Sequence, residues 1–404
     1  MDNISQLNVL LYDKKIGSLH LLPGERILFV FEPEYIENIN RPILSLSFKD
    51  TFGDLITEFR PTRGRLPTFF SNLLPEGPLR EYLARRAGVN ASREFFLIKA
   101  LGDDLPGAIR VVSETTANKV IDDFEVPSKQ TDQTMHFSLA GVQLKFSAII
   151  EASGGLTIPA HGSGGSWIIK LPSFRFKNVP ENEYAMMMIA KKMGMDIPEL
   201  KLVPINKISG LPNDVESVTQ HVLAVKRFDR SQNGSIHIED FAQVFGVYPE
   251  DKYKRASYTN IVQVLLQESG EEDVVELIQR LVFNVLIGNA DMHVKNISLI
   301  YSDVRKAELA PGYDFVSTIA YIPDENMALK LVKSKRMRDL TKEQLEYFAV
   351  KTGLPKKLII DVAKGTVERF NEVWSKEKKH LPINLHTIQM IEKHVKTIPL
   401  YSEI

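Results

Sequence analysis

Hydrophobic and polar residues divide this chain into a strand-rich first half and a helical second half. Short runs of β-branched and aromatic residues, bounded by turn residues, predict strands at residues 9–12 and 26–31. Apolar residues at near-helical spacing predict short helices at residues 68–74 and 78–87, followed by a helix that starts at Ala91. The pattern therefore indicates a small, compact α/β unit at the start of the chain.

A polar stretch at residues 113–133 separates this unit from the rest of the chain, and we interpret it as a linker. Beyond it, residues 145–150 and 167–170 have the composition of antiparallel strands, and residues 222–228 form one more predicted strand. Apolar spacing predicts a helix at residues 182–193. The middle of the chain is thus predicted to be a second, strand-rich unit.

Helical periodicity dominates the remaining residues and is clear at 258–268, 271–287, 341–352 and 384–397. A strand-rich lobe followed by a helical lobe is the layout of a two-lobed, protein-kinase-like fold. The predicted fold class is therefore α+β, with the small α/β unit as an N-terminal subdomain. The predicted domains are residues 1–118 for this subdomain, 130–230 for the strand-rich N-lobe and 231–404 for the helical C-lobe.

The composition is that of an ordinary globular protein, with 404 residues of which 44% are apolar and 25% charged. Fifty basic and 51 acidic side chains give a formal charge of -1, so no global charge favours nucleic acid or a membrane surface. The absence of cysteine excludes disulfides, thiolate metal sites and cysteine nucleophiles. Because charged residues interrupt every apolar run and no signal peptide is evident, we expect a cytoplasmic location.

The strongest chemical signal is the segment GNADMHVKN at residues 288–296, followed by GYDFVS at residues 312–317. An aspartate, four residues, an asparagine and then a second aspartate form the acidic pattern that protein kinases use for phosphoryl transfer. We predict that Asp291 lies near the acceptor hydroxyl and that Asn296 and Asp314 bind magnesium. Taken singly, Asp291 and Asn296 also fit a helix C-cap and turn, but the joint pattern favours catalysis.

Phosphoryl transfer also needs a cation that positions the phosphates. Lys170 follows three apolar strand residues, as the phosphate-binding lysine of kinases does, and Glu183 is its predicted partner, with Glu181 second. Alternatively, the two glutamates are carboxylates that the helix dipole favours at a helix start. We also expect His293 to orient the catalytic loop and Lys295 to neutralise phosphate charge, although such loop residues are more often simply solvated.

The loop that would cover the phosphates departs from the usual kinase pattern, because no Gly-x-Gly-x-x-Gly precedes the first strand of the second unit. In its place stands SLAGVQLK at residues 138–145, whose small residues would let backbone N–H groups approach phosphate. The alternative interpretation is a plain turn into a strand.

Together these motifs resemble the HipA family of bacterial toxin kinases, which belong to toxin–antitoxin modules. The resemblance is carried, in order, by SLAGVQLK at 138–145, IIKLP at 168–172, VKRFDR at 225–230, GNADMHVKN at 288–296 and YDFVS at 313–317. The first unit resembles the leading subdomain of the family, notably in FSNLLPEG at residues 70–77. The resemblance thus spans nearly the whole chain.

The resemblance implies a serine/threonine protein kinase that uses ATP and Mg²⁺ and acts as a growth-arresting toxin. Its implied partners are a small helix-turn-helix antitoxin similar to HipB and a protein substrate such as an aminoacyl-tRNA synthetase, with DNA contacted only through the antitoxin. It further implies that Ser138 is autophosphorylated, which inactivates the enzyme, and that residues 226–228 form the hinge that holds adenine. The implied nucleotide-binding residues are Ala140, Gly141, Val142, Gln143, Leu144, Lys145, Lys170, Lys226, Arg227, Phe228, His293, Lys295, Asn296, Tyr313 and Asp314.

Two other functions are compatible with the same residues. The fold and acidic trio also serve kinases of small molecules, and an antitoxin-bound protein of this kind can act mainly as a transcriptional autoregulator. The basic residues between Lys330 and Arg338 would suit a DNA contact, but a plain solvated face is the favoured interpretation of such a charge run.

Overall fold

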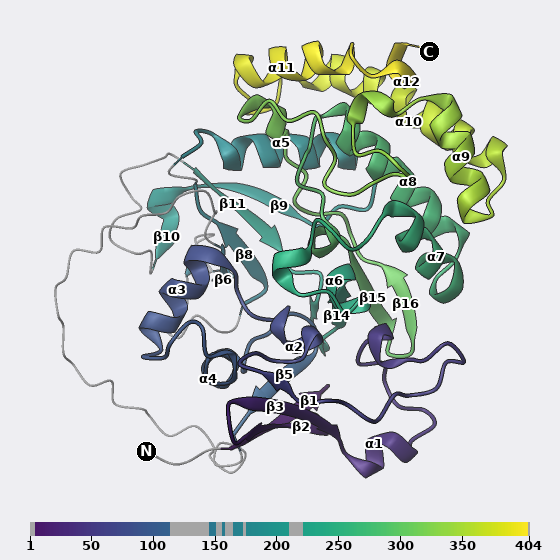
Figure 1. The fold of residues 1–404 in the computed structure, drawn as a ribbon. Helices are drawn as coiled ribbons and strands as arrows, with labels where there is room; N and C mark the ends of the chain where they lie inside the picture. The colour runs from purple at the N-terminus through teal and green to yellow at the C-terminus, as the bar shows by residue number, and fades with distance from the viewer. Residues whose placement is uncertain are drawn as a thin grey trace.

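The computed structural model describes residues 5–113, 145–150, 156–157, 165–172, 175–209 and 221–402 of the 404-residue chain. Three units come one after another: an N-terminal unit, a strand-rich lobe and a helical lobe, drawn in purple and blue, in teal, and in green and yellow respectively (Figure 1). No helix within the described ranges is both long and apolar enough to cross a membrane. The predicted domain limits fall partly outside these ranges and stay a proposal.

The N-terminal unit is built on a five-stranded antiparallel sheet. Its elements are β1 (Gln6–Leu11), β2 (Lys14–Leu22), β3 (Arg26–Phe31), α1 (Pro33–Glu37), β4 (Thr62–Arg63), α2 (Thr68–Ser71), α3 (Gly77–Arg86), α4 (Glu94–Leu101) and β5 (Ile109–Val112), with strand order β4-β3-β2-β1-β5. Buried and partly exposed residues alternate along β1, so one face of the sheet covers the core. The predicted strand at 9–12 begins three residues after the start of β1 and passes its end by one residue, because Tyr12 lies in the tight turn to β2 with φ 51°. The strand β2 itself was not predicted.

The strand-rich lobe is a six-stranded sheet with one covering helix. Its elements are β6 (Lys145–Ile150), β7 (Leu156–Thr157), β8 (Trp167–Lys170), α5 (Val179–Lys192), β9 (Leu200–Pro204), β10 (Ile208–Ser209) and β11 (His221–Lys226), with strand order β10-β7-β6-β8-β11-β9. β6 and β8 pair antiparallel, as predicted, and β8 pairs antiparallel with β11. The helix α5 packs against β9 and β11. The chain order thereby places Lys170 at the end of a central strand, beside the helix that carries Glu183.

The helical lobe contains most of the remaining chain. Its elements are β12 (Arg230–Ser231), β13 (Gly234–Ser235), β14 (His237–Asp240), α6 (Phe241–Val244), α7 (Tyr258–Glu268), α8 (Glu271–Leu286), β15 (Ser298–Asp303), β16 (Lys306–Leu309), α9 (Lys342–Thr352), α10 (Lys356–Glu377), α11 (Leu385–Val395) and α12 (Pro399–Ser402). Short 3-10 turns lie at Pro249–Asp251, Val294–Asn296, Thr318–Ala320 and Met337–Asp339. The four helices predicted here are present as α7, α8, α9 and α11, whereas α10, the longest helix among the described residues, was not predicted.

Buried apolar side chains form three clusters: one in the N-terminal unit, one in the sheet of the strand-rich lobe, and one in the helical lobe that also includes the buried face of α5. In the N-terminal unit this core is rich in phenylalanine, and Phe29 contacts four other aromatic rings of the cluster. The largest cluster lies in the helical lobe, where α8 packs against α10. Apolar contacts also join the units, because Ile43 and Leu46 of the N-terminal unit pack against the core of the helical lobe, and Leu79 and Tyr82 pack against that of the strand-rich lobe.

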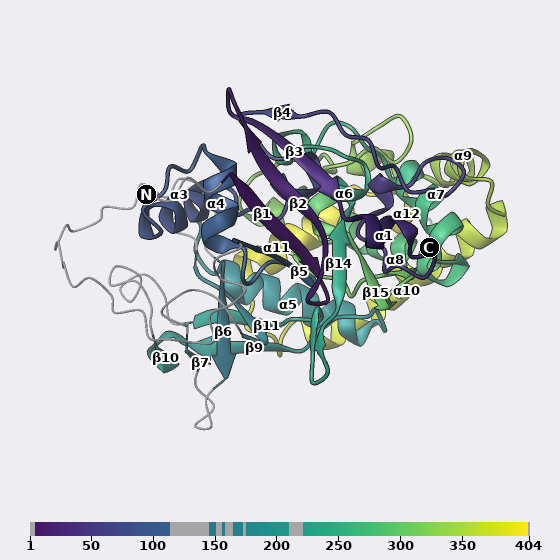
Figure 2. The same ribbon diagram turned by 90° about the horizontal axis from the view of Figure 1, so that it is seen from below.

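The N-terminal unit meets the helical lobe at the three-stranded sheet β14-β15-β16, and Figure 2 shows β14 beside the end of the five-stranded sheet. Here Ser45 donates to the carboxylate of Glu239 on β14 at 2.5 Å, and the Tyr301 hydroxyl donates to the same carboxylate at 2.5 Å. Burial raises the pKa of Glu239 to about 7, although these donors oppose the shift. A carboxylate with little access to water thus lies at the centre of this junction.

Candidate active site

The GNADMHVKN segment forms the loop between α8 and β15. α8 stops at Leu286, and Gly288 then turns the chain with φ +66°. A Cβ atom at this glycine would lie 2.7 Å from Cγ2 of Ile319, so both the backbone conformation and the space require glycine. This turn sends the next residues back across the end of the helix.

Two side chains fix the start of this loop. Asn289 accepts a hydrogen bond from the backbone N–H of Asp291 at 3.0 Å and donates to Asn284 of α8 at 2.7 Å. Thr318 accepts from the backbone N–H of Ala290 at 2.8 Å. The backbone at Asp291 is therefore held in place from the helix and from the segment just beyond Asp314.

The side chain of Asp291 is 51% exposed and accepts a hydrogen bond from the Tyr253 hydroxyl at 2.5 Å. Within the described residues, no other donor is bonded to this carboxylate. Asn296 donates from its amide nitrogen to the carbonyl of Asp291 at 2.9 Å. The structure thus brings the predicted catalytic aspartate and the predicted magnesium-binding asparagine together in one turn.

Asp314 lies in a cluster of opposite charges contributed by both lobes. Its carboxylate accepts from Lys145 of β6 at 2.8 Å and directly contacts Lys170 of β8, which also contacts Glu183 of α5. Asp314 has φ +58°, a left-handed conformation that aspartate tolerates better than most residues. Lys170 and Asp314 lie 144 positions apart in the sequence, and the fold brings them into contact. The kinase-like pattern of residues predicted that they would lie together.

The charge state of this cluster depends on its burial and its contacts. Burial alone would lower the pKa of Lys170, but the carboxylates of Asp314 and Glu183 raise it above its ordinary value. Burial alone would raise the pKa of Asp314, but Lys145 and Lys170 hold it well below its usual range. Burial raises the pKa of Glu183, and Lys170 opposes that rise. At neutral pH, Asp314 is therefore an ionised carboxylate between two ammonium groups.

His293 and Lys295 are both held away from bulk water. His293 is 5% exposed, its ring meets that of Tyr253 edge-on at 5.0 Å, and burial lowers its pKa to about 4. It is therefore uncharged at neutral pH. Lys295 donates to the carbonyl and side-chain oxygens of Asn72, at 2.9 and 3.0 Å, in the N-terminal unit. Its predicted role at a phosphate is untested, and in this structure its ammonium group binds protein acceptors.

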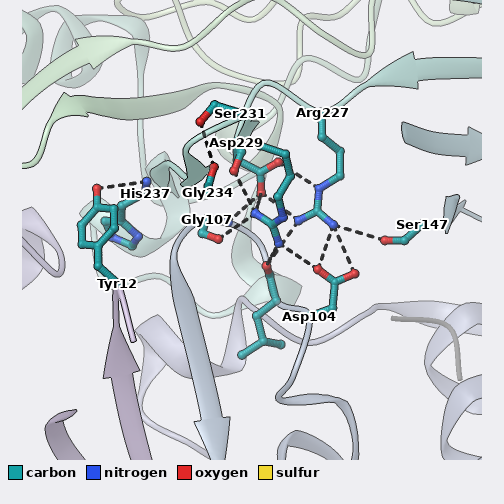
Figure 3. A network of polar contacts seen from close by, with 11 residues as sticks. Tyr12, Asp104, Gly107, Ser147, Arg227, Asp229, Ser231, Gly234 and His237 are labelled. Carbon is teal, nitrogen blue, oxygen red and sulfur yellow. Dashed lines mark hydrogen bonds and ion pairs between the residues drawn. The ribbon is translucent and has the colours of Figure 1, made fainter. Parts of the chain in front are cut away.

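The predicted hinge carries an interdomain network of ion pairs (Figure 3). The guanidinium of Arg227 contacts Asp229 at 2.8 Å, Asp104 of the N-terminal unit at 3.0 Å, and Ser147 of β6 at 3.3 Å. Arg230 donates to the same carboxylate of Asp104 at 2.8 Å. The side chain of Arg227 is thus committed to joining the N-terminal unit to the hinge.

The other hinge residues are placed differently. The backbone N–H groups of Lys226 and Arg227 donate to the carbonyls of Glu199 and Ser166, at 2.9 and 2.8 Å, so both are used within the protein. The ring of Phe228 lies 5.8 Å from that of Tyr313, tilted by 34°. The predicted hinge and the segment that contains Asp314 are therefore neighbours. Ser138 and residues 140–144 of the predicted nucleotide loop lie outside the described residues.

Family models match both parts of the chain. The model described as the HipA-like C-terminal domain matches residues 137–374, and the model described as the HipA N-terminal domain matches residues 7–112. The chain belongs to the HipA family. The resemblance carried by the motifs is thereby confirmed.

Relatives of this HipA-family protein carry kinase names. A Sinorhizobium fredii protein named "Putative kinase Y4dM" is 52% identical over 100% of this chain and 99% of its own length. The serine/threonine-protein kinase toxin HipA of Shewanella oneidensis is 26% identical over 74% of each chain. A solved structure of HipA from Shewanella oneidensis MR-1, in complex with HipB and operator DNA, matches with a TM-score of 0.75 and 21% identity over 98% of this chain and 96% of that one. The structural match confirms the predicted two-lobed, kinase-like α+β fold.

Sequence reasoning missed the residues of this HipA-family protein that support the site from a distance. Asn182 of α5 binds the backbone of Ser317 through both atoms of its amide, and Tyr253 binds Asp291. Asn72 and Glu76 of the N-terminal unit contact Lys295. The only sequence signal for the last two was the FSNLLPEG motif, whose function the sequence did not indicate.

Proposed function

We propose that this protein transfers the γ-phosphoryl group of ATP to a serine or threonine hydroxyl of another protein, as a growth-arresting toxin. The observation that carries the proposal is the contact of Lys170 with both Glu183 and Asp314, because it joins the two lobes by the charges that a kinase needs for phosphates. The kinase toxin name of the Shewanella relative supports the toxin role.

In the proposed reaction, the acceptor hydroxyl donates a hydrogen bond to the exposed carboxylate of Asp291. The hydroxyl oxygen bonds to the γ-phosphorus as the bond from that phosphorus to the β–γ bridging oxygen breaks. ADP leaves, and the hydroxyl proton passes to Asp291. Lys170, held charged by its two carboxylates, positions the phosphates.

The residues present fit a magnesium ion. Asp314 stays ionised at neutral pH, and within the described part of the chain no donor is bonded to the side-chain oxygen of Asn296. Mg²⁺ prefers oxygen ligands and commonly takes only one or two from the protein, with water and phosphate completing its shell. When bound by Asn296 and Asp314, the ion would neutralise charge on the phosphates.

Three further properties belong to the proposal. Autophosphorylation at Ser138 would place nearly two negative charges beside the ATP phosphates and so inactivate the enzyme. The solved complex of the Shewanella protein with HipB and operator DNA supports a small HipB-like antitoxin as partner, with DNA contacted through it. The protein substrate is proposed to be a component of translation such as an aminoacyl-tRNA synthetase.

The decisive experiment compares the full chain with the Asp291→Asn variant in a heat-treated bacterial lysate supplied with labelled ATP and Mg²⁺. We expect label on serine or threonine residues of protein with the wild type and none with D291N. The variant should keep its stability within about 0.5 kcal/mol, because the replaced side chain is half exposed. Retained labelling by D291N would overturn the assignment of Asp291, and label confined to small metabolites would indicate a small-molecule kinase instead.

A further inference from the structure

The FSNLLPEG motif of the N-terminal unit reaches the catalytic loop of the helical lobe. Asn72 in this motif is 6% exposed and accepts from Lys295 with both its backbone and side-chain oxygens. Its amide nitrogen donates to the carbonyl of Val247 in the helical lobe at 2.7 Å. A single buried side chain is therefore fixed from two segments of the other unit.

Glu76, four residues further on, binds two lysines of the helical lobe. Its carboxylate lies 2.9 Å from the ammonium group of Lys252 and 3.4 Å from that of Lys295. Burial alone would raise the pKa of Glu76, but Lys295 and Lys252 lower it, so the carboxylate is ionised at neutral pH. One anion of the N-terminal unit thus neutralises two cations from separate segments.

Each of these lysines directly precedes, in the sequence, a residue that binds Asp291. Lys252 precedes Tyr253, whose hydroxyl donates to Asp291 at 2.5 Å. Lys295 precedes Asn296, whose amide donates to the carbonyl of Asp291 at 2.9 Å. Without Glu76, the two ammonium groups would repel each other across the space between these segments.

Other contacts show that Lys295 is held rather than solvated. Its side chain is 13% exposed, and Asp240 of the helical lobe lies 3.5 Å from its ammonium group. Three acceptor residues, Asn72, Glu76 and Asp240, therefore surround one ammonium group, and two of them come from the N-terminal unit. A displaced catalytic loop is costly because phosphoryl transfer depends on alignment, and an error of about 1 Å can cost a hundredfold in rate.

We propose that Glu76 is a positioning residue for phosphoryl transfer, through which the N-terminal unit holds the catalytic loop and the Tyr253 segment in register with Asp291. The inference rests on the proposed kinase function. It assigns the N-terminal unit a direct part in the rate of the reaction, because the anion that orders the acceptor side comes from that unit.

The test uses the full chain and the variant Glu76→Gln, which keeps the shape of the side chain but loses its charge. The matched control is Glu268→Gln, which breaks the ion pair of Glu268 with Lys49 at 2.8 Å, another contact between the same two units with similar exposure. Protein labelling in a heat-treated bacterial lysate, measured at several ATP concentrations, gives the apparent kcat and the KM for ATP. D291N supplies the background.

We expect kcat to fall about tenfold to a hundredfold in E76Q, with the KM for ATP within about twofold of wild type. E268Q should retain wild-type kcat. Binding of a non-hydrolysable ATP analogue with unchanged stoichiometry would show that the loss does not reflect a smaller folded fraction. Lys252→Met should lower kcat in the same direction, and the double variant should fall less than the product of the two single effects.

Three results would overturn the inference in different ways. A wild-type kcat in both E76Q and K252M would refute the positioning role while leaving the proposed function intact. Absence of protein labelling by the wild-type chain itself would refute the proposed function and with it this inference. An equal loss of kcat in E76Q and E268Q would reduce Glu76 to an ordinary contact between domains.

Discussion

The two sides of the candidate active site are built in different ways. The proposed nucleotide side consists of Lys145, Lys170, Glu183 and Asp314. Lys170 and Glu183 are at most 5% exposed at the side chain, and opposite charges contact one another. The acceptor side is formed around Asp291, whose side chain is 51% exposed and has a single hydrogen bond among the described residues, from Tyr253.

The difference indicates which contacts hold the residues of each side in place. On the nucleotide side, removal of one charge leaves its partners buried and uncompensated, so binding and folding depend on the same contacts. On the acceptor side, the exposed carboxylate contributes little to folding, and its surroundings are ordered by Asn72 and Glu76 of the N-terminal unit. A substitution on the acceptor side should therefore lower activity without lowering stability, whereas a substitution on the nucleotide side should lower both.

The variant Lys170→Met should break the nucleotide side with the largest effect. It leaves Glu183 and Asp314 buried without their shared cation, so we expect a loss of about 3–5 kcal/mol in the free energy of unfolding. Phosphate transfer should fall by at least about a hundredfold, because a cation that stabilises the transferring group is gone. Urea denaturation and labelling measure the two effects.

The comparison variant for K170M is D291N, which should lose activity to a similar extent while its urea midpoint stays near that of wild type. If both variants were equally destabilised, the proposed separation between the two sides would be wrong. If K170M were as stable as wild type, the buried charges would not be compensated in the way described.

Local patterns were sufficient to predict most of the longer helices but only a minority of the strands. Apolar periodicity predicted α7, α8, α9 and α11, because such helices bury one stripe of side chains on a local core. The longest helix, α10, was missed, and so was β2, whose small and polar residues such as Gly17 and Ser18 give a weak strand signal. Propensity alone does not detect elements that tertiary packing selects.

The sequence predicted the contacts of the proposed nucleotide side better than those of the proposed acceptor side. Lys170 and Glu183 lie thirteen residues apart on a strand and the next helix, so their contact is a consequence of local order. Lys295 and Asn72 lie 223 residues apart, and no periodicity relates them. The pairing of Arg227 with Asp104, 123 residues away, was missed for the same reason, since each residue alone resembles an ordinary surface charge.

The pH dependence of Glu239→Gln tests how firmly the N-terminal unit is docked near the acceptor side. The folded pKa of Glu239 is raised to about 7 from an ordinary value of 4.5, so its stabilising contribution is complete below about pH 4.5 and is lost as the pH rises to about 7. Relative to E239Q, the wild type should lose about 3 kcal/mol across this interval. Parallel stability curves for the two proteins would refute a protonated Glu239 at the junction.

The variant Asp104→Asn tests the ion pairs that join the N-terminal unit to the predicted hinge on the nucleotide side. It removes the charge that accepts from Arg227 and Arg230, and a lost charged hydrogen bond in a buried site costs about 2 kcal/mol. Because Arg227 belongs to the predicted hinge, the KM for ATP should rise a few-fold with little change in kcat. The control is Asp103→Asn, since Asp103 is 69% exposed and pairs only weakly with Arg110. A fall in kcat with unchanged KM would place the effect on the acceptor side instead.

The smallest expected effect is that of Tyr253→Phe on the acceptor side. The tyrosine hydroxyl donates to Oδ1 of Asp291 and so holds the half-exposed carboxylate in one orientation, in which Oδ2 can accept from an incoming hydroxyl. A net hydrogen bond is worth about 1 kcal/mol, and its removal should lower kcat about fivefold, with little change in the KM for the acceptor protein. The control is Tyr248→Phe, because Tyr248 lies in the same segment but donates to the carbonyl of Leu66 in the N-terminal unit. If Y253F kept the wild-type kcat and lowered the KM for the acceptor protein instead, the tyrosine would compete with the acceptor rather than orient Asp291.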